Sequence, residues 1–447
     1  MSDTSDMSEN NAGQGVARGR SGGPKIVDIT ITPVAVKDPP LLNASGVHQA
    51  YQLRSIIEVR TDAGIVGLGE AYGDDPTLVN LRRAAPALTG LDVFDLNGLT
   101  RRVAIALGAV EPTAPTDLVG AATRQKTVAQ TVGAFEVACY DAQGKATGLR
   151  VCDLLGGPAR ESVPFSAYLF YRWGEHPEGA APAGYPQDEW GEALDPEGIV
   201  AQAKRMVGIY GFGSLKLKGG VFEPEAEADA IVALREAFPD HPLRLDPNAN
   251  WSLQTAKRIA PRLEPYLEYL EDPVKGNPAM AEMTRATSLP LATNMCVTCF
   301  DEVPEAVALD SVSVVLSDHH YWGGFRASQR LSGICETFGW GLSMHSNTHL
   351  GVSLAAMAHV AAATPNLTYA CDTHSPWQRE QVVDPSALVW DAGSLKLPEG
   401  PGLGVELDRD ALAKLHEQYE ACGIRSRDDT VSMRLRDPGW VRVTPRF

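Results

Sequence analysis

The sequence predicts an α/β protein in which a modified (β/α)8 (TIM) barrel follows an N-terminal α+β capping domain. Between Lys216 and His374, one strand-like apolar segment follows another, and each ends in a polar or ionisable group. Helix-like stretches separate these segments, and the eight strand candidates match the number that closes such a barrel. The candidates are SAYLFY, SLKLKGG, LRLDP, YLEYLEDP, PLATNM, SVSVVLSD, LSMHSN and TYACDTH. Because the chemistry of this fold is built at the carboxyl ends of its strands, the same series indicates an active site.

The 447 residues divide into four parts. Residues 1–24 are polar and rich in Gly and Ser, which predicts a disordered tail. We assign residues 25–160 to the capping domain and residues 161–385 to the barrel that carries the active site. Residues 386–447 form a C-terminal segment with the pattern of return strands and a helix, and we expect it to return to the capping domain.

The capping domain begins with strands and continues with helices. Alternating apolar residues predict a strand in KIVDITITPVAV, and two apolar runs around Asp62, Ala63 and Gly64 predict a hairpin. From Thr77 to Gly148, apolar residues recur at helical spacing. An α+β module therefore precedes the barrel.

The composition excludes several classes of protein. The hydrophobic fraction of 44% and the charged fraction of 21% are ordinary for a soluble enzyme. No apolar run approaches the roughly 20 residues that span a bilayer. The formal net charge of −17 argues against nucleic acid or an anionic membrane as a partner, since both favour basic surfaces. We expect a soluble, cytoplasmic protein that binds a small molecule.

The seven cysteines are an odd number without a dense framework, which indicates a reducing compartment. Cys296 and Cys299 form a lone C-x-x-C pair. A structural zinc needs four ligands, so a zinc or redox role is the weaker interpretation. We expect two thiols in or near the core.

Lys216 and Lys218 lie on one face of the segment LKLK, because side chains alternate along a strand. Two ammonium groups in one pocket destabilise each other, so we expect the pKa of one lysine to be lowered and that lysine to serve as a base. The alternative is a solvated edge strand, on which paired lysines prevent aggregation.

The next three strand ends supply Asp246, Glu271 and Asn294. Three oxygen ligands, two of them anionic, suit Mg²⁺, which keeps open positions for water or substrate oxygens. Taken singly, each residue is equally well explained as a turn residue, a helix cap or a hydrogen-bond partner of the backbone. Together, in barrel order, they predict a magnesium site.

Asp318 and His345 end two adjacent strands further along the chain. A carboxylate beside an imidazole fixes its tautomer and raises its basicity, so the pair predicts an acid/base dyad. A lone histidine is more often structural, but Lys218 lies on a strand roughly opposite, with the metal ligands between. Such a site can move a proton on either face of a metal-bound carbon acid.

These residues resemble the enolase superfamily, and within it the glucarate dehydratase group of mandelate racemase-like acid sugar dehydratases. The resemblance covers nearly the whole chain after the tail. It is carried by LLNASGVH, SAYLFY, KLKGG, LDPNANWSL, EDP, LATNM, MHSNTH, DTH, PGLGVELD and the late RDD with PGW. The string after Asp318, HHYWGG, departs from the Pro-His-Phe-Trp-like string of the group.

The resemblance implies a catalytic role for each strand end. Lys218 would remove the proton α to a substrate carboxylate, and Lys216 would help hold the enediolate. His345, oriented by Asp318, would act as the general acid for the departing β-hydroxyl and as the base for the epimeric substrate. The implied Mg²⁺ ligands are Asp246, Glu271 and Asn294. The implied reaction is dehydration of D-glucarate, or L-idarate, to 5-dehydro-4-deoxy-D-glucarate, by a hydro-lyase that we expect to be a homo-oligomer.

The resemblance also implies a set of substrate-binding residues. They are Asn43, His48, Tyr168, Phe170, Asn248, Ser346, His374 and Arg427. A dianionic sugar acid would thus meet a locally basic pocket in an acidic protein, formed by Lys216, Lys218, His48, His374 and Arg427. The alternative for Arg427 is a surface ion pair with Asp428 or Asp429, and the alternative for Asn43 and His48 is a turn.

Three other functions stay open. A zinc hydrolase barrel is suggested by the ten histidines, but SAYLFY lacks the H-x-H expected on its first strand. An inactive relative that serves as a binding protein would have lost a ligand or a base, yet all are present. A dehydratase of another acid sugar, such as galactarate, would differ in the N-terminal loop and at Arg427.

Overall fold

The computed structural model describes residues 22–108, 112, 122–182, 184–186 and 188–447, so residues 1–21 of the predicted disordered tail lie outside the described residues. The chain then forms a three-stranded antiparallel sheet in the order β1-β4-β5. Its strands are β1 (Ile26–Lys37), β4 (Tyr51–Thr61) and β5 (Val66–Tyr72). The predicted hairpin is confirmed, because β4 pairs antiparallel with β5 through a turn at residues 62–65.

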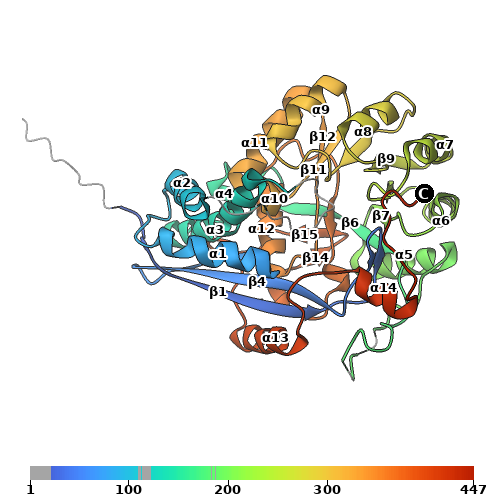
Figure 1. Cartoon of the computed structure of the whole chain (residues 1–447). Coiled ribbons are helices and arrows are strands. Elements are labelled where there is room, and N and C mark those ends of the chain that lie inside the picture. The colour runs from blue at the N-terminus through green and yellow to red at the C-terminus, as the bar shows by residue number, and fades with distance from the viewer. Residues whose placement is uncertain (1–21, 109–111, 113–121, 183, 187) are drawn as a thin grey trace, which may run out of the picture.

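Helices cover this sheet, as the helical spacing of apolar residues predicts (Figure 1). They are α1 (Asp75–Leu88), α2 (Leu96–Leu107) and α3 (Arg124–Thr147). α3 approaches β5 closely at Gly67, where an added Cβ would lie 2.0 Å from the carbonyl oxygen of Ala138. The buried Asp141 of α3 accepts the backbone N–H of Leu68 at 2.8 Å and that of Leu403 at 2.7 Å. α3 thereby joins the capping sheet to the C-terminal segment.

The barrel strands coincide with the eight predicted segments. They are β6 (Ser162–Phe170), β7 (Leu215–Lys218), β8 (Leu243–Asp246), β9 (Leu267–Glu271), β10 (Leu291–Thr293), β11 (Val314–Ser317), β12 (Gly341–Met344) and β13 (Cys371–Thr373). Neighbours in sequence pair in parallel from β6 to β12, and β13 pairs in parallel with β6. The ring closes at β12, where the backbone N–H groups of Thr368 and Tyr369 donate to Leu342 O.

Within the described residues, helices connect the strands and surround them (Figure 1). They are α5 (Pro196–Tyr210), α6 (Pro224–Ala237), α7 (Leu253–Leu263), α8 (Asn277–Thr284), α9 (Val303–Leu309), α11 (Phe325–Phe338) and α12 (Gly351–Ala362). A short helix, α4 (Val151–Leu154), precedes the barrel, and another, α10 (His319–Trp322), follows β11. No described helix is both long enough and apolar enough to cross a membrane.

The segment after β13 contacts first the barrel and then the capping domain. Its strands β14 (Trp390–Asp391) and β15 (Ser394–Lys396) do not return to the capping domain, because β15 pairs with the first residues of β6. The helix α13 (Arg409–Cys422) does reach it, since His416 Nδ1 lies 2.8 Å from Pro33 O of β1. α14 (Thr430–Arg436) then runs past a small ladder of β2 (Leu42–Asn43) and β3 (Gly46–Val47).

Candidate active site

A cavity of about 370 Å³ opens at the carboxyl ends of the barrel strands. The strand ends, the loop around β2 and β3, and the C-terminal segment before α14 form its wall. All the predicted substrate-binding residues line it: Asn43, His48, Tyr168, Phe170, Asn248, Ser346, His374 and Arg427. Lys218, Asn294 and His345 also line it, whereas Lys216, Asp246, Glu271 and Asp318 lie behind this surface.

β7 is an interior strand between β6 and β8, and all four of its residues are buried. The alternative of a solvated edge strand is therefore wrong. Lys218 reaches the cavity, with Nζ 2.7 Å from Asp246 Oδ2. Lys216 is fully buried, and its Nζ lies 2.7 Å from Glu271 Oε2 and 2.7 Å from Asp372 Oδ2.

Lys216 is not the lysine whose pKa is lowered. Burial does act to lower the pKa of Lys216, but the carboxylates of Asp372 and Glu271 outweigh it and raise that pKa well above its ordinary value. The sequence pattern showed Lys218 beside Lys216, but it did not show the carboxylates that surround Lys216. Lys216 is thus a fixed cation beneath the cavity.

The predicted metal ligands occupy the ends of three successive strands. Asp246 and Glu271 are fully buried, and Asn294 is held at the cavity because its backbone N–H donates to Asp272 Oδ2 at 2.8 Å. Glu271 Oε1 is buried and has no hydrogen-bond donor. A buried carboxylate oxygen without a donor is costly unless a cation faces it, and carboxylate and amide oxygens are ligands of Mg²⁺. The three residues therefore fit a hard divalent cation.

Asp246 stays ionised beside this set. Burial alone would raise the pKa of Asp246, but the ammonium groups of Lys218 and Lys216 lower it to about 2. The carboxylate is thus available as an anionic ligand at neutral pH.

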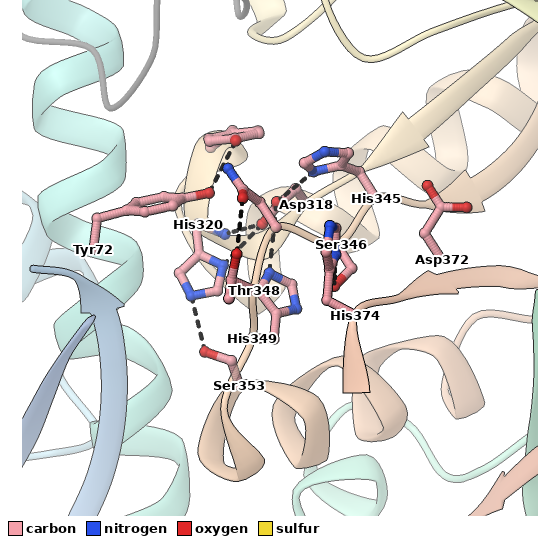
Figure 2. A network of polar contacts seen from close by, with 12 residues as sticks. Tyr72, Asp318, His320, His345, Ser346, Thr348, His349, Ser353, Asp372 and His374 are labelled. Atoms are coloured by element: carbon pink, nitrogen blue, oxygen red, sulfur yellow. Dashed lines mark hydrogen bonds and ion pairs between the residues drawn. The ribbon is translucent and has the colours of Figure 1, made fainter. Parts of the chain in front are cut away.

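Asp318 and His345 lie together as the strand ends predict, with Asp318 Oδ2 3.0 Å from His345 Nδ1 (Figure 2). Although burial opposes ionisation of Asp318, His320 and His345 hold the pKa of this carboxyl well below its usual range. The ring of Tyr321 stacks on His345 at 5.6 Å between centroids. The imidazole is therefore fixed in orientation, with Nε2 as the nitrogen left to act on a substrate.

The pocket holds less free positive charge than the sequence indicates. Arg427 is paired with Asp429 through two hydrogen bonds of 2.8 and 2.6 Å, and His48 Nδ1 lies 2.7 Å from Asp38. Burial lowers the pKa of His374 well below its usual value, so this ring is neutral. His374 therefore offers hydrogen bonds rather than charge, between the rings of Tyr168 and Phe170.

The Arg427–Asp429 pair lies in the wall of the cavity and not on the surface, because Asp429 is only 6% exposed. Asp429 Oδ2 also accepts the side-chain N–H of Asn43 at 2.8 Å. At Gly46, an added Cβ would lie 2.2 Å from Asp429 O, so the two loops touch along the backbone. The alternative of a surface ion pair is therefore wrong, and Asp429 joins the N-terminal loop to the C-terminal segment.

Asp372 and Asp429 are among the residues of the site that the sequence reasoning missed. Asp372 was within the quoted DTH string, two residues before His374 on a strand, and this spacing could have placed it on the same inward face. Asp429 was within the quoted RDD string, but the irregular charged segment around it did not indicate which aspartate enters the site. Cys296 is buried and Cys299 is half-buried, as expected for two thiols in or near the core.

Comparisons with known proteins identify the family of the chain. Residues 26–156 match the family described as mandelate racemase / muconate lactonizing enzyme, N-terminal domain, and residues 198–411 match the family described as enolase C-terminal domain-like. A probable glucarate dehydratase of Streptomyces coelicolor is 53% identical over 94% of this chain and 99% of its own length.

Two solved structures are similarly close. An enolase from Thermobispora bispora, complexed with magnesium and formate, is 55% identical, with a TM-score of 0.91 over 95% of this chain and 100% of its own. An enolase from Pseudomonas fluorescens Pf0-1, with bound magnesium, potassium and tartrate, is 51% identical, with a TM-score of 0.91 and the same coverage of both chains. With matches over both the capping domain and the barrel, the chain belongs to the enolase superfamily.

Proposed function

We propose that this protein is a Mg²⁺-dependent acid sugar dehydratase that converts D-glucarate, and its epimer L-idarate, to 5-dehydro-4-deoxy-D-glucarate. One observation carries the proposal. Lys218 and His345 line the same cavity, Asp318 holds His345 from behind, and the oxygen ligands Asp246, Glu271 and Asn294 lie at the ends of the strands between them. The similarity to a probable glucarate dehydratase supports the substrate class.

In the proposed reaction, Lys218 removes the proton α to the substrate carboxylate, and the electron pair of that C–H bond delocalises into the carboxylate. Lys216, held as a cation by its carboxylate neighbours, stabilises the added negative charge. His345 then donates a proton to the β-hydroxyl, which leaves as water, and the resulting enol becomes the ketone. With L-idarate the α-proton lies on the opposite face, and His345 removes it.

Asp246, Glu271 and Asn294 would hold Mg²⁺, which would supply a second positive charge beside the substrate carboxylate. A unit positive charge about 4 Å from the developing charge contributes roughly 4 kcal/mol at an effective dielectric of 20, or about three orders of magnitude in rate. That contribution exceeds a single hydrogen bond, which is worth about 1 kcal/mol net. The bound ion would therefore contribute more to the rate enhancement than any one polar side chain.

The remaining residues of the wall orient a chain of hydroxyls that ends in a second carboxylate. Arg427 supplies a guanidinium for that distal carboxylate, and Asn43 and His48 face it from the N-terminal loop. Asn248 has a buried side-chain nitrogen without a partner, which suits donation to a substrate hydroxyl. We also propose a cytoplasmic location, which the free cysteines support, whereas assembly as a homo-oligomer stays a prediction.

The experiment is a screen of purified protein with Mg²⁺ against a panel of aldarates and aldonates, with detection of the 2-keto-3-deoxy product. We expect turnover of D-glucarate and L-idarate and weak or no turnover of aldonates, which lack the distal carboxylate. Preferential turnover of galactarate would assign the enzyme to another acid sugar. No turnover of any panel member would reject the dehydratase and favour the inactive relative.

A further inference from the structure

A buried ion pair of the capping domain faces the acid/base dyad. Arg54 of β4 and Glu70 of β5 are 1% and 2% exposed, and Arg54 Nε donates to Glu70 Oε1 at 2.7 Å. The guanidinium carbon also lies 4.6 Å from the ring centroid of Tyr72. Because a buried ion pair seldom stabilises a fold more than apolar residues of the same size, its contacts with other elements are informative.

Glu70 holds the end of the loop that carries His345. Its Oε1 accepts the backbone N–H of Leu350 at 2.9 Å, and its Oε2 accepts that of Ser353 at 2.8 Å. Both donors belong to the first turn of α12, where backbone N–H groups lack partners within the helix. The capping domain thus fixes the helix that follows the His345 loop.

Arg54 reaches the dyad through His320. Its Nη2 lies 3.1 Å from His320 Nε2, and its Nη1 donates to Asn347 O at 3.4 Å in the same loop as His345. A guanidinium has no acceptor, so His320 Nε2 must be the nitrogen without a proton. The proton of His320 is then on Nδ1, which donates to Asp318 Oδ1 at 2.9 Å.

The two carboxylate oxygens of Asp318 consequently have different hydrogen-bond partners, and His349 Nε2 lies further away, 3.8 Å from Oδ2. In Figure 2 Asp318 lies between His320 and His345, and its Oδ1 is held by His320 while its Oδ2 is held by His345. Ser353 Oγ lies 3.0 Å from His320 Nε2 and can donate to the same lone pair. Protonation of Nε2 would place an N–H against the guanidinium and add a like charge beside it.

The other rings around His320 do not change this arrangement. The rings of His319 and His349 lie 4.1 and 4.7 Å from that of His320, and burial lowers the pKa of both well below the usual range. The ring of Tyr72 lies 5.7 Å away. Among the described side chains that contact His320, Asp318 and Arg54 therefore carry the charge.

We infer that Arg54 is a positioning residue for the dyad: it holds His320 as a neutral Nδ1–H donor, so that Asp318 keeps its negative charge for His345. The inference rests on the proposed function, in which His345 exchanges protons with the substrate. It assigns to the capping domain a part in the acid/base chemistry of the barrel. Without Arg54, His320 would compete with His345 for the charge of Asp318.

The first test is R54M, with R326M as the matched control. Arg326 also forms an ion pair between the barrel and the capping domain, with Glu136 at 2.7 Å, and its other guanidinium hydrogen bonds go to Leu96, Asn97 and Thr100 of α2. We expect R54M to lower dehydration of D-glucarate and proton abstraction from L-idarate by about 30-fold, the usual scale for a residue that orients a catalytic ligand. Deuterium exchange into D-glucarate, which depends on Lys218, should change less than about threefold.

A merely structural role would lower all three rates together, and that result would overturn the inference. R326M should leave each of them unchanged. If neither wild type nor variant acts on acid sugars, the proposed function fails, and the ¹⁵N resonances of histidine decide the inference independently. They should show His320 protonated at Nδ1 and not at Nε2 in the wild type, and the reverse would refute it.

A double-mutant cycle gives the sharpest separation. The substitution H320N keeps a donor toward Asp318 but removes the group that could become a cation. In the H320N background, R54M should therefore lower the dehydration rate by no more than about a further threefold. Full additivity of the two substitutions would reject a route through His320. If R54M does not fold by circular dichroism, R54Q takes its place in the same cycle.

Discussion

The ammonium nitrogen of Lys218 lies 2.7 Å from Oδ2 of Asp246, so the proposed base and a proposed metal ligand form one ion pair. Lys216 Nζ approaches the same oxygen at 3.5 Å. The lysine pair and the oxygen ligands are therefore one electrostatic unit. A change in the charge of the lysine pair should therefore alter metal binding, and a change in the ligands should alter the lysines.

Removal of divalent metal should abolish activity, and added Mg²⁺ should restore it. E271Q should weaken Mg²⁺ binding by about 10- to 100-fold, because it replaces an anionic oxygen that has no hydrogen-bond donor. Isothermal titration with Mg²⁺ measures this directly. E282Q removes the same charge from an exposed carboxylate and serves as the control. Turnover that survives in chelator would reject the oxygen-ligand site.

Substitution of each proposed base in turn should distinguish the role of Lys218 from that of His345. We expect K218A to lower D-glucarate turnover by about 10²–10⁴-fold, the range of general base catalysis, and H345N to stop loss of the β-hydroxyl. H345N should still allow deuterium exchange into D-glucarate in D2O, because Lys218 remains. Mass spectrometry of recovered substrate provides the measurement. Intact D-glucarate turnover in both variants would contradict the assigned mechanism.

Arg427 should act mainly on substrate binding. R427M removes charge-assisted hydrogen bonds worth about 1.5–3 kcal/mol, so KM for D-glucarate should rise by about 10- to 100-fold with a smaller change in kcat. R436M is the matched control, because Arg436 belongs to the same C-terminal segment but stacks on Trp173 outside the cavity. An unchanged KM for D-glucarate in R427M would show that Arg427 does not contact the distal carboxylate.

His359 should make the stability of the folded state depend on pH. Burial lowers the pKa of His359 to about 4, and its ring accepts the N–H of Cys152 and faces Leu403 O at 3.1 Å. The unfolded chain, with an ordinary pKa near 6.5, binds a proton first as the pH falls. The stability of the folded state should therefore decrease from about pH 6.5 to about pH 4, by about 3 kcal/mol in total.

The measurement is the unfolding midpoint in denaturant across this pH range, for wild type and H359Q. The variant has lost the titrating ring, so its stability should vary less steeply with pH even though it starts lower. Equal slopes for the two proteins would show that another group causes the acid sensitivity.

Local patterns were enough to predict the strands and the residues at their ends. The alternation of side chains placed Lys216 and Lys218 on one face, and successive parallel strands brought Asp246, Glu271 and Asn294 to one edge. The hairpin of β4 and β5 likewise needed only its own turn residues. These features depend on residues that are near in sequence or on repeated strand–helix units.

Features that depend on distant partners could not be predicted in this way. Arg54 and His320 are 266 residues apart, and Asn43 and Asp429 are 386 residues apart. Neither pair has a shared motif that marks it. The raised pKa of Lys216 has the same origin, because its sign depends on carboxylates from other strands, Asp372 among them.

The contact between β1 and α13 depends on the spacing of residues along each element and not on the side chains of β1. His416 and Gln418 bond to main-chain oxygens of Pro33 and Ala35, which any side chain at those positions would leave in place. Substitutions along this part of β1 can therefore accumulate without loss of these bonds, whereas an inserted or deleted residue shifts both acceptors. Chimaeras that exchange the first module between relatives should succeed when strand length is kept, even where residue identity is not.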